Sequence, residues 1–240
     1  MGILSIVATP IGNLEDLTFR AKRTLEEADF VLCEDTRVTK KLLDHYQIKT
    51  PTISYHQHSG VLKTDRLLSL LSEGKHLALV SDAGTPGISD PGGKLISAVR
   101  EKFGTEVRLE SIPGASALTT LLALAGAGFD RFLFLGFPPH KKGRQKMLQA
   151  VVANPYPVVL YESKHRIIKL LEELTELAVY KSVNLQVMIG RELTKMHESF
   201  YEGRPEEVRQ VLLKSESNLK GEFVLIVSQI GKKLPVLSEE

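Results

Sequence analysis

The chain has 240 residues, and its 31 lysines and arginines are nearly balanced by 29 aspartates and glutamates, so the formal net charge is only +2. This balance excludes a globally basic nucleic-acid binder, and a nucleic-acid partner would have to be held by local patches. The single cysteine, Cys33, excludes an internal disulfide framework and a cysteine-based zinc site. No stretch approaches about eighteen uninterrupted apolar residues, and no signal-peptide pattern opens the chain, so we expect a cytoplasmic protein without a membrane span.

The first half of the chain alternates apolar runs with amphipathic segments. Leu14, Leu17, Ala21, Leu25 and Ala28, for example, recur at helical spacing. We expect strands at residues 3–8, 30–33, 52–55, 77–80 and 107–112, and helices at 14–28, 40–46, 63–72 and 94–103. Strands that alternate with helices at this spacing predict an α/β domain with a mostly parallel sheet.

The second half begins with an almost wholly apolar helix at 118–125, which should be buried. We expect strands at 132–137, 158–161, 185–189, 198–202 and 223–227, with helices at 145–153 and 166–177. Because little helix separates 185–189 from 198–202, this half should contain a mixed or antiparallel sheet. The chain is therefore predicted to form two α/β domains, at 1–115 and 116–232, followed by a loose tail at 233–240.

The most informative stretch follows the apolar run at 77–80, where residues 81–93 contain four glycines and two prolines. Ligands of open α/β sheets bind beyond the carboxyl ends of the strands, and glycine lets backbone approach a ligand. We therefore expect residues 84–91 to hold a small molecule, although a long connection that only turns the chain is the alternative. A phosphate-binding P-loop is excluded because Gly93 stands where that motif requires lysine, and no G-x-G-x-x-G follows a strand.

A second turn of the same kind lies at residues 112–117. Ser116 is placed to cap the apolar helix that follows, which would leave backbone N–H groups for a carboxylate or another acceptor. A plain helix cap without a ligand is the equally simple interpretation of this turn.

Several loop motifs occur in a fixed order along the chain. They are TPIGN at 9–13, EDTR at 34–37, SDAGTPGISDPG at 81–92, PG at 113–114, YES at 161–163, RELTK at 191–195 and GEFV at 221–224. Together they resemble the ribosomal RNA small subunit methyltransferase I family of the tetrapyrrole-methylase-like superfamily. The resemblance is collinear from Leu4 to about Gly231, and it favours a ligand-binding role for the central loop.

The resemblance implies an enzyme that uses S-adenosylmethionine to methylate the ribose 2′-hydroxyl of a cytidine in the decoding region of 16S ribosomal RNA. It also implies two α/β domains with the cofactor between them, a homodimer, and 16S ribosomal RNA or the small ribosomal subunit as partner. Carried over position by position, the cofactor-binding residues are Pro10, Ala83, Gly84, Thr85, Ile88, Ser116, Ala117, Glu162 and Leu193. Porphyrinoid methylases usually carry a glycine-rich first loop and an aspartate at the place of Thr85, so this chain departs from a tetrapyrrole-directed pattern.

Methyl transfer to a ribose hydroxyl requires that the hydroxyl lose its proton, either to a positioned base or to water late in the transition state. The candidate loop carboxylates, each of which more often caps a turn or pairs with a cation, are Glu34, Asp35, Asp82, Asp90, Glu162 and Glu192. The RELTK motif places Glu192 close to Lys195, whose ammonium group would stabilise an alkoxide or hold a phosphate. Our hypothesis is that Glu192 and Lys195 act on the ribose as the catalytic pair.

Residues 140–146 carry four full positive charges and form the best local footprint for RNA, with a solvated loop as the alternative. The expected RNA contacts are Arg37, Lys141, Lys142, Arg144 and Lys146, with Lys164 and Arg166 among the possible extensions. His56 and His58 have a metal-like spacing, but no carboxylate or cysteine set accompanies them, so we expect no metal site. Two other functions stay open, namely a methylase of a porphyrinoid and a non-catalytic ribosome-binding protein that retains the cofactor fold.

Overall fold

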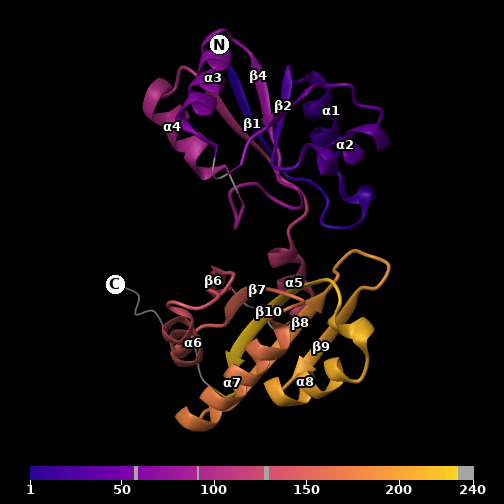
Figure 1. Ribbon diagram of the computed structural model, residues 1–240, viewed down its shortest axis with the longest axis vertical. Coiled ribbons are helices and arrows are strands. Elements are labelled where there is room, and N and C mark those ends of the chain that lie inside the picture. Colours follow the sequence, from indigo (N-terminus) through magenta and orange to yellow (C-terminus); the bar gives the residue numbers. More distant parts are fainter. Residues whose placement is uncertain (57–58, 91, 127–129, 232–240) are drawn as a thin grey trace. The chain divides into compact units, whose positions relative to one another are not determined.

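The computed structural model describes residues 1–56, 59–90, 92–126 and 130–231 (Figure 1). The chain divides into two compact units, which we call unit 1, Met1–Ser116, and unit 2, which begins at Ala117. His58, Pro91 and the predicted tail at 233–240 lie outside the described residues.

Unit 1 is a parallel α/β domain. Its strands and helices, in chain order, are β1 (Ile3–Val7), α1 (Phe19–Glu27), β2 (Phe30–Cys33), α2 (Thr36–His45), β3 (Thr52–Ser54), α3 (Val61–Ser72), β4 (His76–Leu79), α4 (Gly93–Phe103) and β5 (Arg108–Ile112). All pairs in its sheet are parallel, and the strand order is β3-β2-β4-β1-β5. Strand β1 thus lies between β4 and β5, so the three loops that leave these strands start at neighbouring points of one sheet edge.

Helices cover both faces of this sheet, α1 and α2 on one side and α3 and α4 on the other (Figure 1). Val7, Ala21 and Val31 belong to the first layer of the core, and Leu4 and Leu67 to the second. The apolar run at 77–80 is buried throughout, as its sequence predicts. Cys33 is buried in the first layer, and this burial raises the pKa of its thiol.

Unit 2 contains a mixed sheet. Its elements are α5 (Ala117–Ala125), β6 (Leu133–Gly136), α6 (Arg144–Ala153), β7 (Val158–Ser163), α7 (Ile167–Lys181), β8 (Leu185–Arg191), β9 (Ser199–Gly203), α8 (Pro205–Leu213) and β10 (Glu222–Gln229). The strand order is β6-β7-β10-β8-β9, in which β6 pairs with β7 in parallel and the other pairs are antiparallel. The predicted fold class, α/β with a parallel first sheet and a mixed second sheet, is therefore confirmed.

Several elements differ from the sequence prediction, among them α2, which begins at Thr36 rather than Lys40, and α7, which extends to Lys181. Helix α1 begins at Phe19 rather than Leu14, because the Thr18 side chain accepts a hydrogen bond from the Ala21 amide and caps the helix there. The prediction that the apolar helix at 118–125 is buried is wrong for most of its residues. Of α5 only Leu121 is buried, since the helix packs one face on β8 and β10. Helix α8 was not expected, although Pro205 in its first turn is a recognised start signal.

Candidate functional site

Three loops of unit 1 meet at the carboxyl ends of β4, β1 and β5. Thr9 and Gly84 form an antiparallel bridge, in which the Thr9 amide donates to the Gly84 carbonyl at 2.9 Å and the Gly84 amide donates to the Thr9 carbonyl at 3.0 Å. The Thr85 hydroxyl donates to the Ala115 carbonyl at 3.3 Å. The structure thus brings Pro10, Gly84, Thr85 and Ser116 into one group of joined loops.

Small and buried side chains make this junction possible. Thr9 and Ser81 are both buried, and their hydroxyls donate to loop carbonyls, Thr9 to Ser81 at 3.1 Å and Ser81 to Gly84 at 3.1 Å. A Cβ at Gly114 would lie 3.0 Å from the Cβ of Ala8, so glycine lets the two loops approach closely here. Gly84 has φ +83°, a backbone conformation that residues other than glycine rarely adopt.

The outer surface of the junction suits a nucleoside. Ala83, Gly87, Ile88 and Gly114 are exposed there, and they offer apolar surface and bare backbone with little side-chain bulk. Backbone that is free of side-chain bulk can approach a ligand closely. The residue types of these loops are therefore compatible with a small ligand such as the nucleoside part of S-adenosylmethionine.

A compact polar cluster lies in unit 2 between the end of β8 and the start of β10. The Lys195 ammonium donates to Glu192 Oε1 at 2.8 Å and to Glu222 Oε2 at 2.9 Å. The Glu222 amide also donates to Glu192 Oε1, at 3.0 Å. Glu192 and Lys195 are partly exposed, so the cluster is open to a ligand.

An unusual backbone holds this cluster. Glu192 has φ +51° and Thr194 φ +68°, and the Lys195 amide donates to the Glu192 carbonyl, so residues 192–195 form a turn and not a helix. A Cβ at Gly221 would lie 2.4 Å from Cδ of Glu192, so glycine is required there. Non-glycine residues with positive φ are costly and persist where the surroundings enforce them, often at functional sites.

Buried Arg191 fixes the neighbouring loops. Its guanidinium donates to the carbonyls of Lys220, His197 and Ser217, which lie on two different connections of unit 2. Arg191 is therefore a structural support for the turn at 192–195.

The pKa values of the cluster show which groups are charged. Burial alone would raise the pKa of Glu192, but the hydrogen bonds from Lys195 and from the Glu222 amide outweigh it and the pKa is lowered. Burial alone would lower the pKa of Lys195, but its hydrogen bonds to Glu192 and Glu222 outweigh it and the pKa is raised. At neutral pH Glu192 is thus an anion that is a weaker base than an ordinary glutamate, and Lys195 is a cation.

A family model described as Tetrapyrrole (Corrin/Porphyrin) Methylases matches residues 4–209. A protein of Synechocystis sp. named Ribosomal RNA small subunit methyltransferase I is 45% identical over 242 residues, which cover 100% of this chain and 84% of that protein. A protein of the same name from Halalkalibacterium halodurans is 46% identical and matches 97% of this chain and 78% of its own length. This chain belongs to the ribosomal RNA small subunit methyltransferase I family, within the tetrapyrrole methylases.

Solved structures agree with this family at the level of the fold. Cobalt precorrin-4 methyltransferase, a cobalamin biosynthetic enzyme, matches 93% of this chain and 94% of its own with a TM-score of 0.67. The two sequences are only 16% identical, so this likeness shows the shared fold alone.

Two of the predicted cofactor contacts, Glu162 and Leu193, have side chains in the interior of unit 2. The Glu162 carboxylate is buried and lies 2.7 Å from Arg166 Nη2 and 3.5 Å from Arg144 Nη1. Leu193 is buried against Gly190, where a Cβ would come within 2.9 Å of its methyl groups. Both side chains support the interior of unit 2, and only their backbone atoms remain for a cofactor contact.

Arg144 also differs from the expectation that it contacts RNA. Its side chain is only 4% exposed, its Nε donates to Glu173 at 2.8 Å, and its Nη1 donates to the Pro139 carbonyl. A guanidinium held in this way is not available to a phosphate, so we correct the predicted RNA footprint by removing Arg144 from it.

The other predicted RNA contacts are exposed. Lys141, Lys142 and Lys146 lie on the surface of unit 2, and Arg37 lies at the start of α2 in unit 1 with 87% of its side chain exposed. Arg37 pairs with Asp35 at 2.6 Å, and its hydrogen bonds lower the pKa of that carboxyl to about 2.

Sequence reasoning missed Glu222 as a site residue. The GEFV motif contains it, but nothing in the spacing shows that a residue 27 positions after Lys195 completes the same cluster. The antiparallel pairing of β10 with β8, in which Phe223 lies opposite Arg191, is what brings the two segments together.

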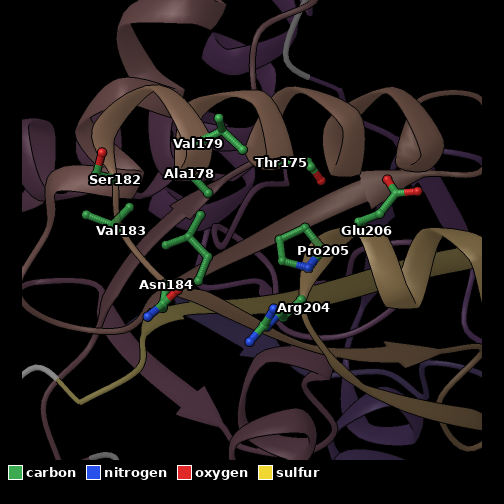
Figure 2. Close-up of a pocket in the computed structure, with 10 residues that line it drawn as sticks. Thr175, Ala178, Val179, Ser182, Val183, Asn184, Arg204, Pro205 and Glu206 are labelled. Carbon is green, nitrogen blue, oxygen red and sulfur yellow. The ribbon is translucent and has the colours of Figure 1, made fainter.

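Figure 2 shows a pocket of about 460 Å³ in unit 2. Thr175 and Val179 of α7, Asn184 before β8, and Pro205 and Glu206 of α8 line it. It contains none of the residues predicted from the sequence to bind the cofactor or RNA.

The described residues 1–56, 59–90, 92–126 and 130–231 contain no group of three or more histidine, cysteine or acidic side chains placed to hold a metal ion. Of His56 and His58, whose spacing resembles that of metal ligands, His58 lies outside this part of the chain. Within the same residues, no helix has the length and apolar character needed to cross a membrane.

Proposed function

We propose that this protein transfers a methyl group from S-adenosylmethionine to the ribose 2′-hydroxyl of a cytidine in the decoding region of 16S ribosomal RNA. The observation that carries the proposal is the 45–46% identity, over nearly the whole chain, to proteins named Ribosomal RNA small subunit methyltransferase I. The cobalamin biosynthetic neighbour shares the fold but only 16% of its residues, so it carries no argument for a tetrapyrrole substrate.

In this proposal the joined loops of unit 1 bind the methyl donor, which supplies an electrophilic methyl carbon on a sulfonium centre. Ala83 and Ile88 lie against the nucleoside. Gly84 joins two loops through its bridge to Thr9, and Thr85 fixes the spacing between two loops through its hydrogen bond to Ala115. Pro10, Ser116 and Ala117 complete the cofactor-binding set. Rigid loops of this kind align a reacting group before the chemical step.

Lys195 is the proposed catalytic residue of unit 2. As the bond from the ribose oxygen to the methyl carbon forms and the carbon–sulfur bond breaks, the hydroxyl proton leaves to water and the Lys195 cation stabilises the oxygen. Glu192 is an anion with a lowered pKa and already accepts two hydrogen bonds, so we assign it the positioning of Lys195 and not the removal of the proton.

The proposed RNA surface comprises Lys141, Lys142 and Lys146, with Arg37 as a contact from unit 1. These exposed cations would bind phosphates and so supply affinity, but they would not distinguish one RNA sequence from another. We also propose that the protein acts as a homodimer in the cytoplasm, on 16S ribosomal RNA or on the small ribosomal subunit.

The test is incubation with labelled S-adenosylmethionine and either unmethylated small ribosomal subunits or free 16S ribosomal RNA, followed by mapping of the ribose that resists alkaline cleavage. Label at a single cytidine ribose supports the proposal. Label on a base instead of a ribose, label on an added porphyrinoid instead of RNA, or tight donor binding without transfer to any RNA would each contradict it.

A further inference from the structure

The loop before α6 has a fixed shape. It leaves β6 at Gly136 and passes through Phe137, Pro138 and Pro139 before it reaches the basic residues. Two consecutive prolines fix their own φ angles, so this loop loses little conformational freedom when a ligand binds.

Two arginines hold this loop by its proline carbonyls. Arg166 Nη1 donates to the Pro138 carbonyl at 2.9 Å, and Arg144 Nη1 donates to the Pro139 carbonyl at 3.3 Å. The buried Glu162 carboxylate lies against both guanidinium groups and balances their charge. The arginines, Glu162 and the prolines thus place residues 137–139 in one position on unit 2.

Phe137 is the exposed end of a row of three aromatic rings. Its side chain is 50% exposed, and its ring centroid lies 5.4 Å from that of Tyr161 on β7. Tyr161 in turn lies 5.1 Å from Phe134 on β6 in an edge-to-face contact. The sheet therefore supports the Phe137 ring from one side while half of its surface stays open.

Exposed cations lie close to this ring along the chain and on the neighbouring turn. Lys141 and Lys142 follow Phe137 by four and five residues, so their Cα atoms lie within about 18 Å of it. Exposed Lys164 and His165 immediately precede Arg166, whose hydrogen bond to Pro138 brings that turn beside the loop. The aromatic ring and these exposed cations therefore come from the same loop and from the turn that is hydrogen-bonded to it.

We infer that Phe137 is a stacking platform for an unpaired nucleotide of single-stranded RNA, with Lys141, Lys142 and Lys164 holding the flanking phosphates. This inference rests on the proposed function, because it takes RNA as the partner. The positive charge favours a polyanion over a neutral protein surface, and an aromatic face accepts a base only where that base is not already stacked in a duplex.

The test compares the affinity of the full-length protein for a short unstructured oligoribonucleotide and for a blunt RNA duplex of equal length, at one fixed salt concentration. Phe137→Ala should weaken binding of the single strand by about 5- to 100-fold and leave binding of the duplex unchanged. Phe137→Leu keeps apolar bulk without a π face and should behave like the alanine variant, whereas Phe137→Trp should bind as the original protein does.

Tyr180→Ala is the matched control. Tyr180 is also an exposed aromatic residue of unit 2 with a lysine beside it, Lys181, but it lies near the other end of α7, about 20 Å along the helix from Ile167. Its replacement should leave both RNA affinities unchanged. Thermal unfolding of each variant shows whether a loss of affinity reflects loss of the fold.

Five results would overturn the inference: a wild-type protein that does not bind the single strand, unchanged single-strand affinity in Phe137→Ala, equal loss of both RNA affinities in Phe137→Ala, wild-type affinity in Phe137→Leu, or a change in oligomeric state on gel filtration of Phe137→Ala. Methylation of small subunits is measured in parallel. If methylation occurs but Phe137→Ala binds the single strand normally, the platform is wrong and the proposed function stands. If methylation fails but the selective loss is seen, the proposed function is wrong and the platform stands.

Discussion

The Thr85 hydroxyl donates a hydrogen bond to the carbonyl of Ala115, 30 residues further along the chain, at 3.3 Å. Thr85 follows β4 and Ala115 follows β5, and β1 lies between these two strands in the sheet. This bond therefore spans β1 and ties together two of the loops that we propose bind the cofactor.

Replacing Thr85 with Val should weaken binding of S-adenosylmethionine by about 2- to 12-fold, because it removes one hydrogen bond at nearly constant shape. Titration calorimetry measures this affinity. Thr105→Val is the control, since Thr105 is exposed and precedes the amino end of β5 at the opposite edge of the sheet. Equal donor affinities for the two variants would show that the Thr85 bond does not shape the binding loops.

Gly221→Ala should be more destabilising than Gly231→Ala, although both glycines have positive φ. An alanine at either position costs about 1–2 kcal/mol for its backbone conformation. Only at Gly221 does the new Cβ also meet Glu192, at 2.4 Å, whereas nothing lies within 4 Å at Gly231. Guanidinium unfolding and the methylation rate would measure the difference, and equal values for the two variants contradict the close packing of Glu192.

Lys195→Met should lower the single-turnover methylation rate by about 100- to 1,000-fold and leave the affinity for the methyl donor unchanged. The reason is the loss of the cation that stabilises the ribose oxygen. Lys214→Met, which removes an exposed lysine at the end of α8, should react at the original rate. A wild-type rate for Lys195→Met would end the assignment of Lys195 as the catalytic residue.

The ion pair of Glu192 and Lys195 should make stability depend on pH in a defined direction. The pKa of Glu192 is lowered in the fold from its usual value of about 4.3, so its stabilising effect is complete above that value and is lost as the pH falls through the folded pKa. The pKa of Lys195 is raised, so its effect is complete below about 10.4 and is lost as the pH rises through the folded value.

Denaturant unfolding of the original protein and of Glu192→Gln between about pH 7 and about pH 3 tests the acid limb of this dependence. The stability difference between the two proteins should be constant near neutral pH and should shrink below about pH 4.3. A difference that stays constant to the lowest pH would mean that the carboxylate gains nothing from Lys195 and the Glu222 amide.

Arg144→Met should destabilise the protein by about 3–5 kcal/mol, because it leaves the buried carboxylates of Glu162 and Glu173 without their shared cation. Lys146→Met, two residues away on the surface, should change the stability by no more than about 0.5 kcal/mol. If Arg144→Met keeps full stability and loses RNA affinity, then Arg144 is an RNA ligand after all.

Much of the fold could be predicted from the sequence. The five strands of unit 1 follow from short apolar runs, and the position of the central loop follows from the glycines and prolines after the buried run at 77–80. The extent of burial of α5 could not be predicted. Apolar composition indicates that a helix is at least partly buried, but it does not show how many of its faces pack against other elements.

The site residues of unit 2 show a second limit. In the sequence, Arg144 looks like one more cation of a basic loop. The buried carboxylates that pair with it, Glu162 and Glu173, are 18 and 29 residues away in the sequence. Glu222 joins Lys195 only through the pairing of two antiparallel strands. Local patterns identify the residue types, whereas the partners of each charge depend on long-range register.

The position of Cys33 has a practical consequence. Its thiol is buried and its pKa is raised, so it is a poor target for maleimides and other thiolate-directed reagents. Because the sequence has no other cysteine, one introduced at exposed Gln145, beside the proposed RNA contacts, would take up a fluorescent label selectively in the native protein. A single fluorescent reporter of RNA binding can therefore be attached without replacing Cys33.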